Sequence, residues 1–270
     1  MKSYNKYCIW VISFLLLSCS DYLERKPLVF PADETFISTQ EELEQAVVAC
    51  YNPLRFTMAS RPFPIFFETV SDISWGREST DMQIIGNGAH DARTESFLQA
   101  WTYFYTGVGR CNYVLNNIGR CKDVVEENLF KQRESEVRFL RALYYHYLTE
   151  LFGGVPLITK TLTLAESQIG RNAKEEVVNF ILDELEACAV NFTSDESLST
   201  GRASKEAAWA LASRVALYNE KWDIAIRNAQ KVMEQEGEKV ELSSDYENLF
   251  LYAGEKSKEI ILSLQFLRGD

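Results

Sequence analysis

The longest regular pattern of apolar and polar residues in the chain runs from Glu136 to Thr159. Apolar residues recur there at every third or fourth position, in two rows: Val137, Leu140, Tyr144, Leu148 and Leu151, and Phe139, Leu143 and Tyr147. Polar residues fall in one narrow stripe: Glu134, Arg138, Arg141, Tyr145 and Thr149. This spacing predicts a helix that is apolar around most of its circumference and lies inside a layered helical protein. Gly153 and Gly154 can end the helix, and Pro156 prevents its continuation.

The same period predicts five further helices. We expect them from Thr39 to about Phe56, over residues 97–118, from Asn172 to about Phe192, from Ser204 onward, and from Trp222 to about Gln235. Thr39 with Glu42, and Asn172 with Glu175, have the spacing of a capping box, in which two side chains satisfy free amides at a helix start. The long helix is expected to begin near Val124.

Two segments depart from the helical period. Residues 60–95 are predicted to form a long loop, and a loop of that length within a compact domain is usually functional or disordered. Residues 259–266 read EIILSLQF and form the only convincing strand in the sequence. Its apolar side chains need a cover. We therefore expect this segment to lead into a further part of the protein and to leave an exposed apolar patch, prone to aggregation, when that part is missing.

The last two predicted helices match one tetratricopeptide repeat, a helical hairpin of about 34 residues. When Trp209 is placed at the repeat's first conserved aromatic position, Trp222 falls at the second and Ala225 at the small position where the two helices touch. Gly237 replaces the terminating proline. The predicted fold class is therefore all-α, with degenerate tetratricopeptide-like hairpins, inserted loops and a minor extended segment near the C-terminus.

The N-terminus has the pattern of a lipoprotein signal peptide, predicted over residues 1–18. Lys2 and Lys6 precede a short apolar stretch, and Ser18 stands directly before Cys19. A small residue before cysteine is what a lipoprotein signal peptidase requires, so Cys19 is the predicted lipidation site. The alternative is an ordinary cleaved signal with an incidental cysteine. The mature chain is predicted to be one domain, residues 19–270.

Composition agrees with a secreted globular domain. Of 270 residues, 46% are hydrophobic and 13% aromatic, which is enough for a sizeable core. The net charge of -11 disfavours binding to nucleic acid and to anionic lipid headgroups. No mature segment approaches the roughly 18 apolar residues of a membrane helix, so lipid is expected to provide the membrane attachment.

The residues available for catalysis or metal binding are few. His146 lies among the apolar residues of the long helix and is expected to be a hydrogen-bonded core histidine. The four mature cysteines after Cys19 have no metal or redox spacing and are expected as buried thiols, although a disulfide remains open: Cys50, Cys111, Cys121 and Cys188. Adjacent acids such as Glu175 and Glu176 fit first helical turns, where they complement the helix dipole. We expect no enzyme activity, cofactor or metal.

A binding surface is expected within residues 60–95. Sugar recognition needs a flat aromatic ring for the apolar sugar face and polar groups that hydrogen-bond hydroxyls. This segment contains both kinds, and its candidate ligand-binding residues are Asp72, Trp75, Arg77, Asp81, Asn87 and Arg93, with His90 nearby. The alternative is a structural insert in which Trp75 packs on the helices. Trp101 is expected in the core because of its place in a helix.

The sequence of the long helix and of the segment that follows it closely resembles a signature of the SusD/RagB family of outer-membrane nutrient-binding lipoproteins. The matching motif, from Arg138 to Leu157, is R-F-L-R-A-x-x-Y-x-x-L-x-x-x-F-G-x-V-P-L. Three further stretches resemble family members: Cys19 to Glu24, Gly201 to Lys205, and Ile260 to Ser263. The resemblance therefore extends from Cys19 to Phe266. It implies a fold of degenerate tetratricopeptide-like hairpins with inserted loops.

The resemblance also implies a function. SusD-like proteins are surface-exposed lipoproteins of the outer membrane that capture glycans, or in some members peptides. They act as a lid over a SusC-like TonB-dependent transporter and are not enzymes. The rival class is a lipid-anchored scaffold, because tetratricopeptide-like hairpins commonly bind partner proteins. Family members usually run to about twice this length, so we expect a fragment, a truncated product or a short paralogue with weak or absent glycan binding.

Overall fold

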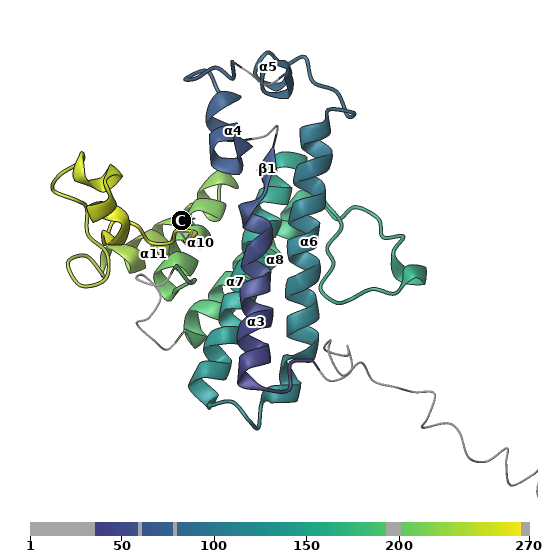
Figure 1. Cartoon of the computed structure of the whole chain (residues 1–270), viewed down its shortest axis with the longest axis vertical. Helices are drawn as coiled ribbons and strands as arrows, with labels where there is room; N and C mark the ends of the chain where they lie inside the picture. The colour runs from purple at the N-terminus through teal and green to yellow at the C-terminus, as the bar shows by residue number, and fades with distance from the viewer. Residues whose placement is uncertain (1–35, 59–60, 78–79, 193–200, 266–270) are drawn as a thin grey trace, which may run out of the picture. The chain divides into compact units, whose positions relative to one another are not determined.

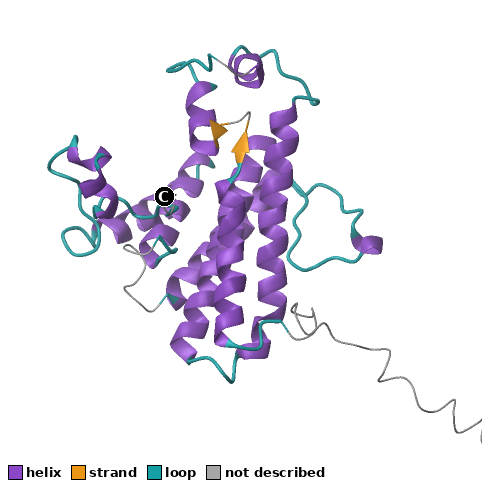
Figure 2. Ribbon diagram, viewed as in Figure 1, coloured by secondary structure: helices purple, strands orange, loops and turns teal. Residues whose placement is uncertain are grey.

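A computed structural model of the chain describes residues 36–58, 61–77, 80–192 and 201–265. The chain divides into two compact units, Met1–Phe36 and Ile37–Asp270. The first unit lies almost wholly outside the described residues, and so do the predicted signal peptide and Cys19. The described part of the second unit is mainly helical, as Figure 2 shows. Among the described residues, no helix is long and apolar enough to cross a membrane.

The α-helices of the described residues alternate with short 3₁₀ turns and one small hairpin. The helices are α3 (Gln40–Tyr51), α4 (Phe63–Thr69), α5 (Thr80–Gly86), α6 (Glu95–Asn117), α7 (Glu127–Phe152), α8 (Lys174–Asn191), α10 (Lys205–Tyr218) and α11 (Trp222–Met233). The 3₁₀ turns are η1 (Asn52–Arg55), η2 (Ile118–Cys121), η3 (Leu164–Glu166), η4 (Asn248–Phe250) and η5 (Tyr252–Lys256). Strands β1 (Thr57–Met58) and β2 (Arg61–Pro62) pair antiparallel.

Helix α7 is the centre of the fold, as its apolar pattern predicted. It packs against α3, α6 and α8, which run alongside it in Figure 1. Tyr144 and Leu148 are fully buried. Helices α6 and α7 approach closely at Gly107 of α6, where an added Cβ atom would come within 2.4 Å of the Tyr144 ring. At its end, Gly153 takes a φ of 71°, a left-handed value that suits glycine, and this confirms the predicted stop.

The polar stripe of α7 is buried against its neighbours. Arg141, which is 5% exposed, donates from Nη2 to Glu184 Oε2 of α8 at 2.5 Å and from Nη1 to Asn112 Oδ1 of α6 at 2.8 Å. Arg138 donates to the other carboxylate oxygen of Glu184 at 2.9 Å. Tyr145 exchanges hydrogen bonds with the backbone of Ile158 in the loop that follows α7. One stripe of side chains therefore fixes two helices and the exit loop.

A second buried ion network joins α7 to α3 and to the segment before α10. Glu136 is fully buried and pairs with Arg133 of its own helix and with Arg202, whose Nη1 lies 3.0 Å from Glu136 Oε2. The same two arginines also bind Glu44 of α3, at 2.6 and 2.7 Å. Tyr51 donates to Glu136 at 2.9 Å. Paired charges of this kind avoid the large cost of an isolated buried charge.

The hairpin α10–α11 has the packing that the repeat pattern predicted. Ala225 is buried, and its carbonyl accepts a hydrogen bond from Ser213 Oγ of the facing helix at 2.9 Å. Ser204 caps α10 as expected by accepting from the amide of Ala207. Trp222, placed at a conserved aromatic position, is instead 55% exposed, because no described element covers that face of α11.

Three predictions of local structure were wrong. Residues 60–95 are not a structureless loop, since α4 and α5 lie within them; both helices are short, so no long period marks them in the sequence. Asn172 does not cap α8, whose N-cap is Ala173. Asn172 accepts instead from the amide of Leu157 and donates to Glu176. The predicted strand forms no ladder within residues 259–265, because no second strand lies beside it among the described residues.

The four cysteines of the described residues confirm the expectation of buried thiols: Cys50, Cys111, Cys121 and Cys188 are all free and buried. Burial raises the pKa of the Cys111 thiol well above its ordinary value, and burial also raises that of Cys188. Cys111 and Cys188 therefore favour the neutral thiol, and all four cysteines pack as small apolar groups.

The contact at Gly107 gives a direct test of the packing of α6 on α7. Gly107→Ala is expected to lower the free energy of unfolding by about 1–3 kcal/mol, because its methyl group would overlap the Tyr144 ring. Gly109 lies two residues on in the same helix and has no atom within 4 Å of its Cβ position. Gly109→Ala should keep or raise stability by up to about 1 kcal/mol through helix propensity. Urea unfolding curves that coincide for the two variants would contradict the packing.

Candidate functional site

The candidate ligand-binding residues lie on the segment that joins the β1–β2 hairpin to α6. We call residues 66–96 the crest. Figure 1 shows its helices, α4 and α5, beyond the same end of the long helices as β1. The crest connects to α6 at one side and to the hairpin at the other, so the long helices provide its support.

Trp75 is presented on a turn that the backbone of α4 holds in place. The side chains of Ser71 and Ser74 both donate to the carbonyl of Glu68, at 2.6 and 2.7 Å. The indole that follows is 60% exposed. The alternative in which Trp75 packs into the helices therefore does not describe this structure. A ring held this way is available to stack on a ligand with little loss of conformational freedom.

The far side of the same turn is fixed by α5. Gln83 donates from Nε2 to the carbonyls of Gly76 and Arg77, at 3.1 and 3.2 Å. Gly76 is buried against Met82, and a Cβ atom there would come within 2.7 Å of the Met82 Cβ. This glycine is required by close approach rather than by its backbone angles. The turn that carries Trp75 is thus held from both ends.

Asp72 and Arg77 share this turn with Trp75. Both are exposed, and neither side chain makes a hydrogen bond or ion pair with another described residue. Their carboxylate and guanidinium are free to bind the hydroxyls of a ligand that lies on the indole. Three of the six candidates therefore lie on one turn, within six consecutive residues.

Asp81 has a structural role in this arrangement. Its Oδ2 accepts from the amide of Ser96 at 3.0 Å and from the Ser96 hydroxyl at 2.8 Å. Ser96 lies in the first turn of α6 and is 1% exposed. Asp81 thus satisfies a free amide at the start of α6 and ties α5 to it. This carboxylate helps to position the crest, and one of its oxygens is already engaged.

The remaining candidates lie on the connection between α5 and α6. Asn87 is exposed, and its side chain has no partner among the described residues. Arg93 pairs with Asp91 at 2.9 Å while its side chain remains 92% exposed. This arginine holds the pKa of the Asp91 carboxyl below its ordinary value. His90 packs edge-on against Phe97, with 5.2 Å between ring centroids. Among the described residues, no hydrogen bond, ion pair or ring contact joins the side chains of Asn87, His90 and Arg93 to the Trp75 turn.

Sequence reasoning identified the residues that face solvent but missed those that hold them. Ser71, Ser74 and Gln83 fix the turn, and their signal in the sequence is weak because hydroxyl and amide side chains are common in loops. The expectation for Trp101 was also incomplete. Trp101 packs against Tyr105 and Phe152, with 4.8 and 5.2 Å between ring centroids, but it is half-buried rather than enclosed.

His146 is buried, as expected, but the expected hydrogen bond is absent from the described structure. Its Nδ1 has no partner, and its ring lies 6.3 Å from that of Tyr218. Burial, together with the positive charges of Arg214 and Lys174, lowers the pKa of His146 to about 4. The imidazole is therefore neutral at ordinary pH. Within the described residues, no group of three or more His, Cys, Asp or Glu side chains could hold a metal ion.

The fold and the crest define a class of protein: a bundle of tetratricopeptide-like hairpins that presents an aromatic ring and polar groups on an open surface. The family model described as "Starch-binding associating with outer membrane" matches residues 21–217. The chain belongs to this SusD-like family, which confirms the resemblance found in its sequence.

Individual relatives agree with this assignment. SusD-like protein P25 of Formosa agariphila is 26% identical over 99% of this chain and 53% of its own length. A SusD-like protein of Bacteroides fragilis has a crystal structure that superimposes with a TM-score of 0.77 at 27% identity, over 91% of this chain and 48% of its own. A laminarin-binding SusD-like protein superimposes with a TM-score of 0.70 at 26% identity, over 78% and 48%. The chain thus spans about half the length of the relatives it matches.

Proposed function

We propose that this protein captures glycans at the outer membrane and delivers them to a SusC-like TonB-dependent transporter. The observation that carries the proposal is Trp75, an exposed indole on a rigid turn with Asp72 and Arg77 beside it. In a chain of a family described as starch-binding, this arrangement offers a stacking face and two hydrogen-bonding groups to one sugar ring. Asn87 and Arg93 are secondary candidates for a longer ligand.

The chemistry of the crest suits binding rather than catalysis. A glycosidase needs two carboxylates that face one glycosidic bond, one of them protonated. On the crest, Asp81 is engaged by Ser96, Asp91 by Arg93 and Glu95 by Gln99. The exposed carboxylates of Glu68 and Asp72 have no partner among the described residues, and neither is held in a pair of the kind that a glycosidase uses. We therefore assign no catalytic residue, cofactor or metal.

A lipid anchor is the attachment that we propose. The sequence around Cys19 supports diacylglycerol and fatty acyl groups such as palmitate on this cysteine. More than one acyl chain makes such an anchor stable. The protein would then be surface-exposed at the outer membrane, next to the transporter.

A lipid-anchored protein-interaction scaffold is the second candidate. It is favoured by an apolar stripe on α11, where Trp222, Ile226 and Met233 are each more than half exposed. A pulldown distinguishes the two functions. A SusC-like barrel as main partner supports glycan uptake, whereas a soluble helical partner supports the scaffold.

Glycan binding is expected to depend on Trp75. We expect weak binding of laminarin or starch oligosaccharides to residues 20–270, because the matched relatives have twice the length to surround a ligand. Trp75→Ala should weaken that binding at least about tenfold, a loss of roughly 1.4 kcal/mol, through the loss of the stacking face. Isothermal titration of both proteins measures the change.

Trp222→Ala is the matched control, because Trp222 is similarly exposed but lies on α11. It should bind glycans like the parent. Equal affinities for the parent and for Trp75→Ala, or an equal loss in the two variants, would refute the role of the crest.

Membrane attachment is expected to depend on Cys19. Cys19→Ala should move the protein from the membrane pellet to the soluble fraction, because the thiol that accepts the lipid is gone. Cys121→Ala serves as the control and should leave the protein in the pellet. Lipid attachment at Cys19 is refuted when the Cys19→Ala protein sediments with the membranes as the parent does.

A further inference from the structure

Two cysteines meet inside the helical bundle, where α3 packs on α6. Cys50 lies in the last turn of α3 and Cys111 in the second half of α6, and both are fully buried. Figure 1 shows these two helices side by side. Each cysteine continues the buried face of its own helix, which is formed by Leu43, Ala46 and Val47 on α3 and by Phe104, Gly107 and Val108 on α6.

Hydrogen bonds between the two helices place the cysteines at the same level. Arg110 of α6 directly precedes Cys111 in the chain. It donates from Nη1 to the carbonyl of Ala49 at 2.8 Å and to Asn52 Oδ1 at 3.2 Å. These two acceptors lie on either side of Cys50 in the sequence. The register of α3 against α6 is therefore set by contacts that do not involve sulfur.

Tyr144 of α7 fixes the same level from a third helix. Its hydroxyl donates to the carbonyl of Cys50 at 2.6 Å. Its ring lies against Gly107, which is about one helical turn before Cys111. The two cysteines are thus enclosed by α3, α6 and α7.

The two sulfur atoms lie within hydrogen-bonding distance of each other. The Cys50 thiol donates to the carbonyl of Ala46 at 3.3 Å, so its sulfur is left to act as an acceptor. Burial raises the pKa of the Cys111 thiol most, and a hydrogen bond with Cys50 raises it further. A disulfide forms where two cysteine side chains point toward each other across a short gap, and this pair has that arrangement.

The other two buried cysteines bond within their own elements. Cys121 donates to the carbonyl of Ile118 in η2 at 3.1 Å, and Cys188 donates to the carbonyl of Leu185 in α8 at 3.3 Å. Within the part of the chain that the structure describes, neither of them bonds to a cysteine. The close contact between thiols therefore distinguishes one pair among the four.

We propose that Cys50 and Cys111 form a disulfide that cross-links α3 to α6 when the chain folds in an oxidising compartment. The signal peptide proposed for residues 1–18 leads to such a compartment. The oxidant is a second disulfide, either that of a small thiol such as glutathione or that of a protein. The cross-link goes beyond glycan capture and does not rest on it.

The bond forms by thiol–disulfide exchange. The thiolate of one cysteine attacks a sulfur of the donor disulfide, whose S–S bond breaks, and the leaving thiolate takes up the proton that the cysteine lost. The thiolate of the second cysteine then attacks the cysteine sulfur of this mixed disulfide and expels the second donor thiol, which is protonated in the same way. The two cysteines lose two electrons, and the donor disulfide gains them.

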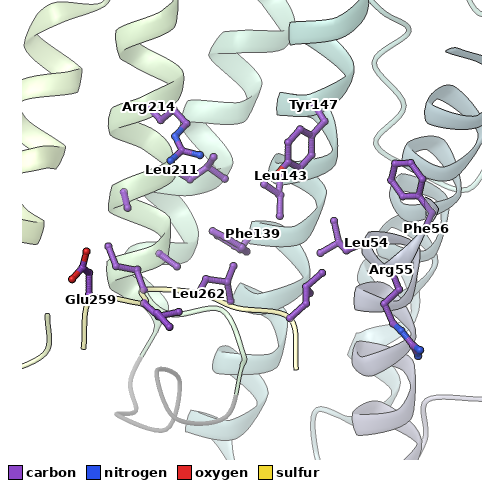
Figure 3. A pocket seen from close by; sticks show the side chains of 15 residues that line it. Leu54, Arg55, Phe56, Phe139, Leu143, Tyr147, Leu211, Arg214, Glu259 and Leu262 are labelled. Carbon is purple, nitrogen blue, oxygen red and sulfur yellow. The ribbon is translucent and has the colours of Figure 1, made fainter. Parts of the chain in front are cut away.

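This exchange belongs to the folding of the chain rather than to the folded protein. Both sulfurs are fully buried, and the raised pKa of Cys111 keeps its thiolate scarce. The apolar groove between α7 and α10, shown in Figure 3, gives no access to them, because no cysteine is among the described residues that line it. The oxidant therefore acts before α3 packs on α6, and the finished bond is shielded from reductants.

The cross-link closes the part of the chain that carries the crest. Residues 51–110 lie between the two cysteines, and they include the β1–β2 hairpin and the whole crest. A disulfide stabilises mainly by restricting the unfolded chain, and the effect grows with the length of the closed loop. The bond therefore keeps α3 and α6 together while the crest between them opens and closes.

The test uses the whole chain with Cys8→Ser and Cys19→Ser, which leaves the four described cysteines. This parent is unfolded in urea with reductant and is then refolded, in mild detergent, with a mixture of reduced and oxidised glutathione. Free thiols are alkylated before digestion. A second sample is folded with its thiols reduced and receives oxidised glutathione afterwards. It should form the bond at least about tenfold more slowly than the refolding sample does, because its sulfurs are buried.

Peptide mapping identifies the bond. Trypsin cuts the chain after Arg55, Arg110 and Arg120, so that Cys50, Cys111 and Cys121 fall on three different peptides. In the refolded sample, the peptides that carry Cys50 and Cys111 should be joined as the main linked product and should separate on reduction.

Thermal unfolding measures the effect of the bond, with each variant compared in its oxidised and reduced forms. Oxidation should raise the melting temperature of the parent by at least about 4 °C. Cys111→Ala should show no such rise. Cys188→Ala is the matched control and should keep the rise, since Cys188 is equally buried but lies outside the pair. Any loss of packing in a variant affects both of its forms and cancels in the comparison.

Three outcomes would overturn the proposal. The first is a folded parent from the glutathione mixture in which Cys50 and Cys111 both carry the alkylating group. The second is a main linked product that joins either of them to Cys121 or Cys188. The third is a rise in melting temperature on oxidation that is the same in Cys111→Ala as in the parent.

Discussion

The pairing of Arg141 with Glu184 is the interaction on which the rest of the structure depends. Arg141 is in the middle of α7, and its guanidinium reaches Glu184 of α8, Asn112 of α6 and the carbonyl of Thr159 in the exit loop. A charge that is 5% exposed is tolerated only when its donors are satisfied. The buried guanidinium therefore requires α6, α8 and the exit loop to pack around Arg141. In turn, the acceptors that these three elements supply offset the cost of burying its charge.

The candidate binding surface depends on the packing around Arg141 indirectly, through α6. Helix α6 runs from Arg141's partner Asn112 back to Ser96, where Asp81 ties the crest to its first turn. The turn that carries Trp75 is then fixed by hydrogen bonds within the crest itself. A ligand would therefore meet a ring that is already in place, supported through α6 by the ion network of α7.

The sequence predicted the long helices well, because their apolar residues repeat over many turns and few other structures satisfy such a period. The end of α7 at Phe152 was predicted correctly, whereas its start was expected near Val124 and lies at Glu127. The cap at Ser204 and the small contact at Ala225 were predicted from residue type at the expected positions. The short helices α4 and α5 were not predicted, because a helix of seven residues has too few turns for an apolar period to be recognised. The cap expected at Asn172 failed because a tertiary contact with Leu157 competed for the same side chain.

The candidate site was predictable in composition but not in arrangement. Asp72, Trp75 and Arg77 could be selected by residue type, yet nothing local distinguishes them from Asp81, whose carboxylate is used to cap α6. The residues that pair with the polar side chains of α7 could not be predicted from the sequence either. Arg141 and Glu184 are 43 residues apart, and their pairing depends on how whole helices pack. The strand-like segment 259–265 shows the same limit, because a strand requires a neighbour that local sequence does not specify.

A double-mutant cycle on Arg141 and Glu184 tests the central claim most directly. Urea unfolding of Arg141→Met, Glu184→Leu and the double variant gives the coupling between α7 and α8. We predict that each single change costs about 3–5 kcal/mol, because Glu184→Leu leaves Arg141 as a buried charge without its carboxylate, and Arg141→Met leaves the buried Glu184 with only the partly exposed Arg138 as its partner. The double variant should cost less than the sum of the two by at least about 1 kcal/mol. Costs that add to within about 0.5 kcal/mol would show that the pair does not hold the helices together.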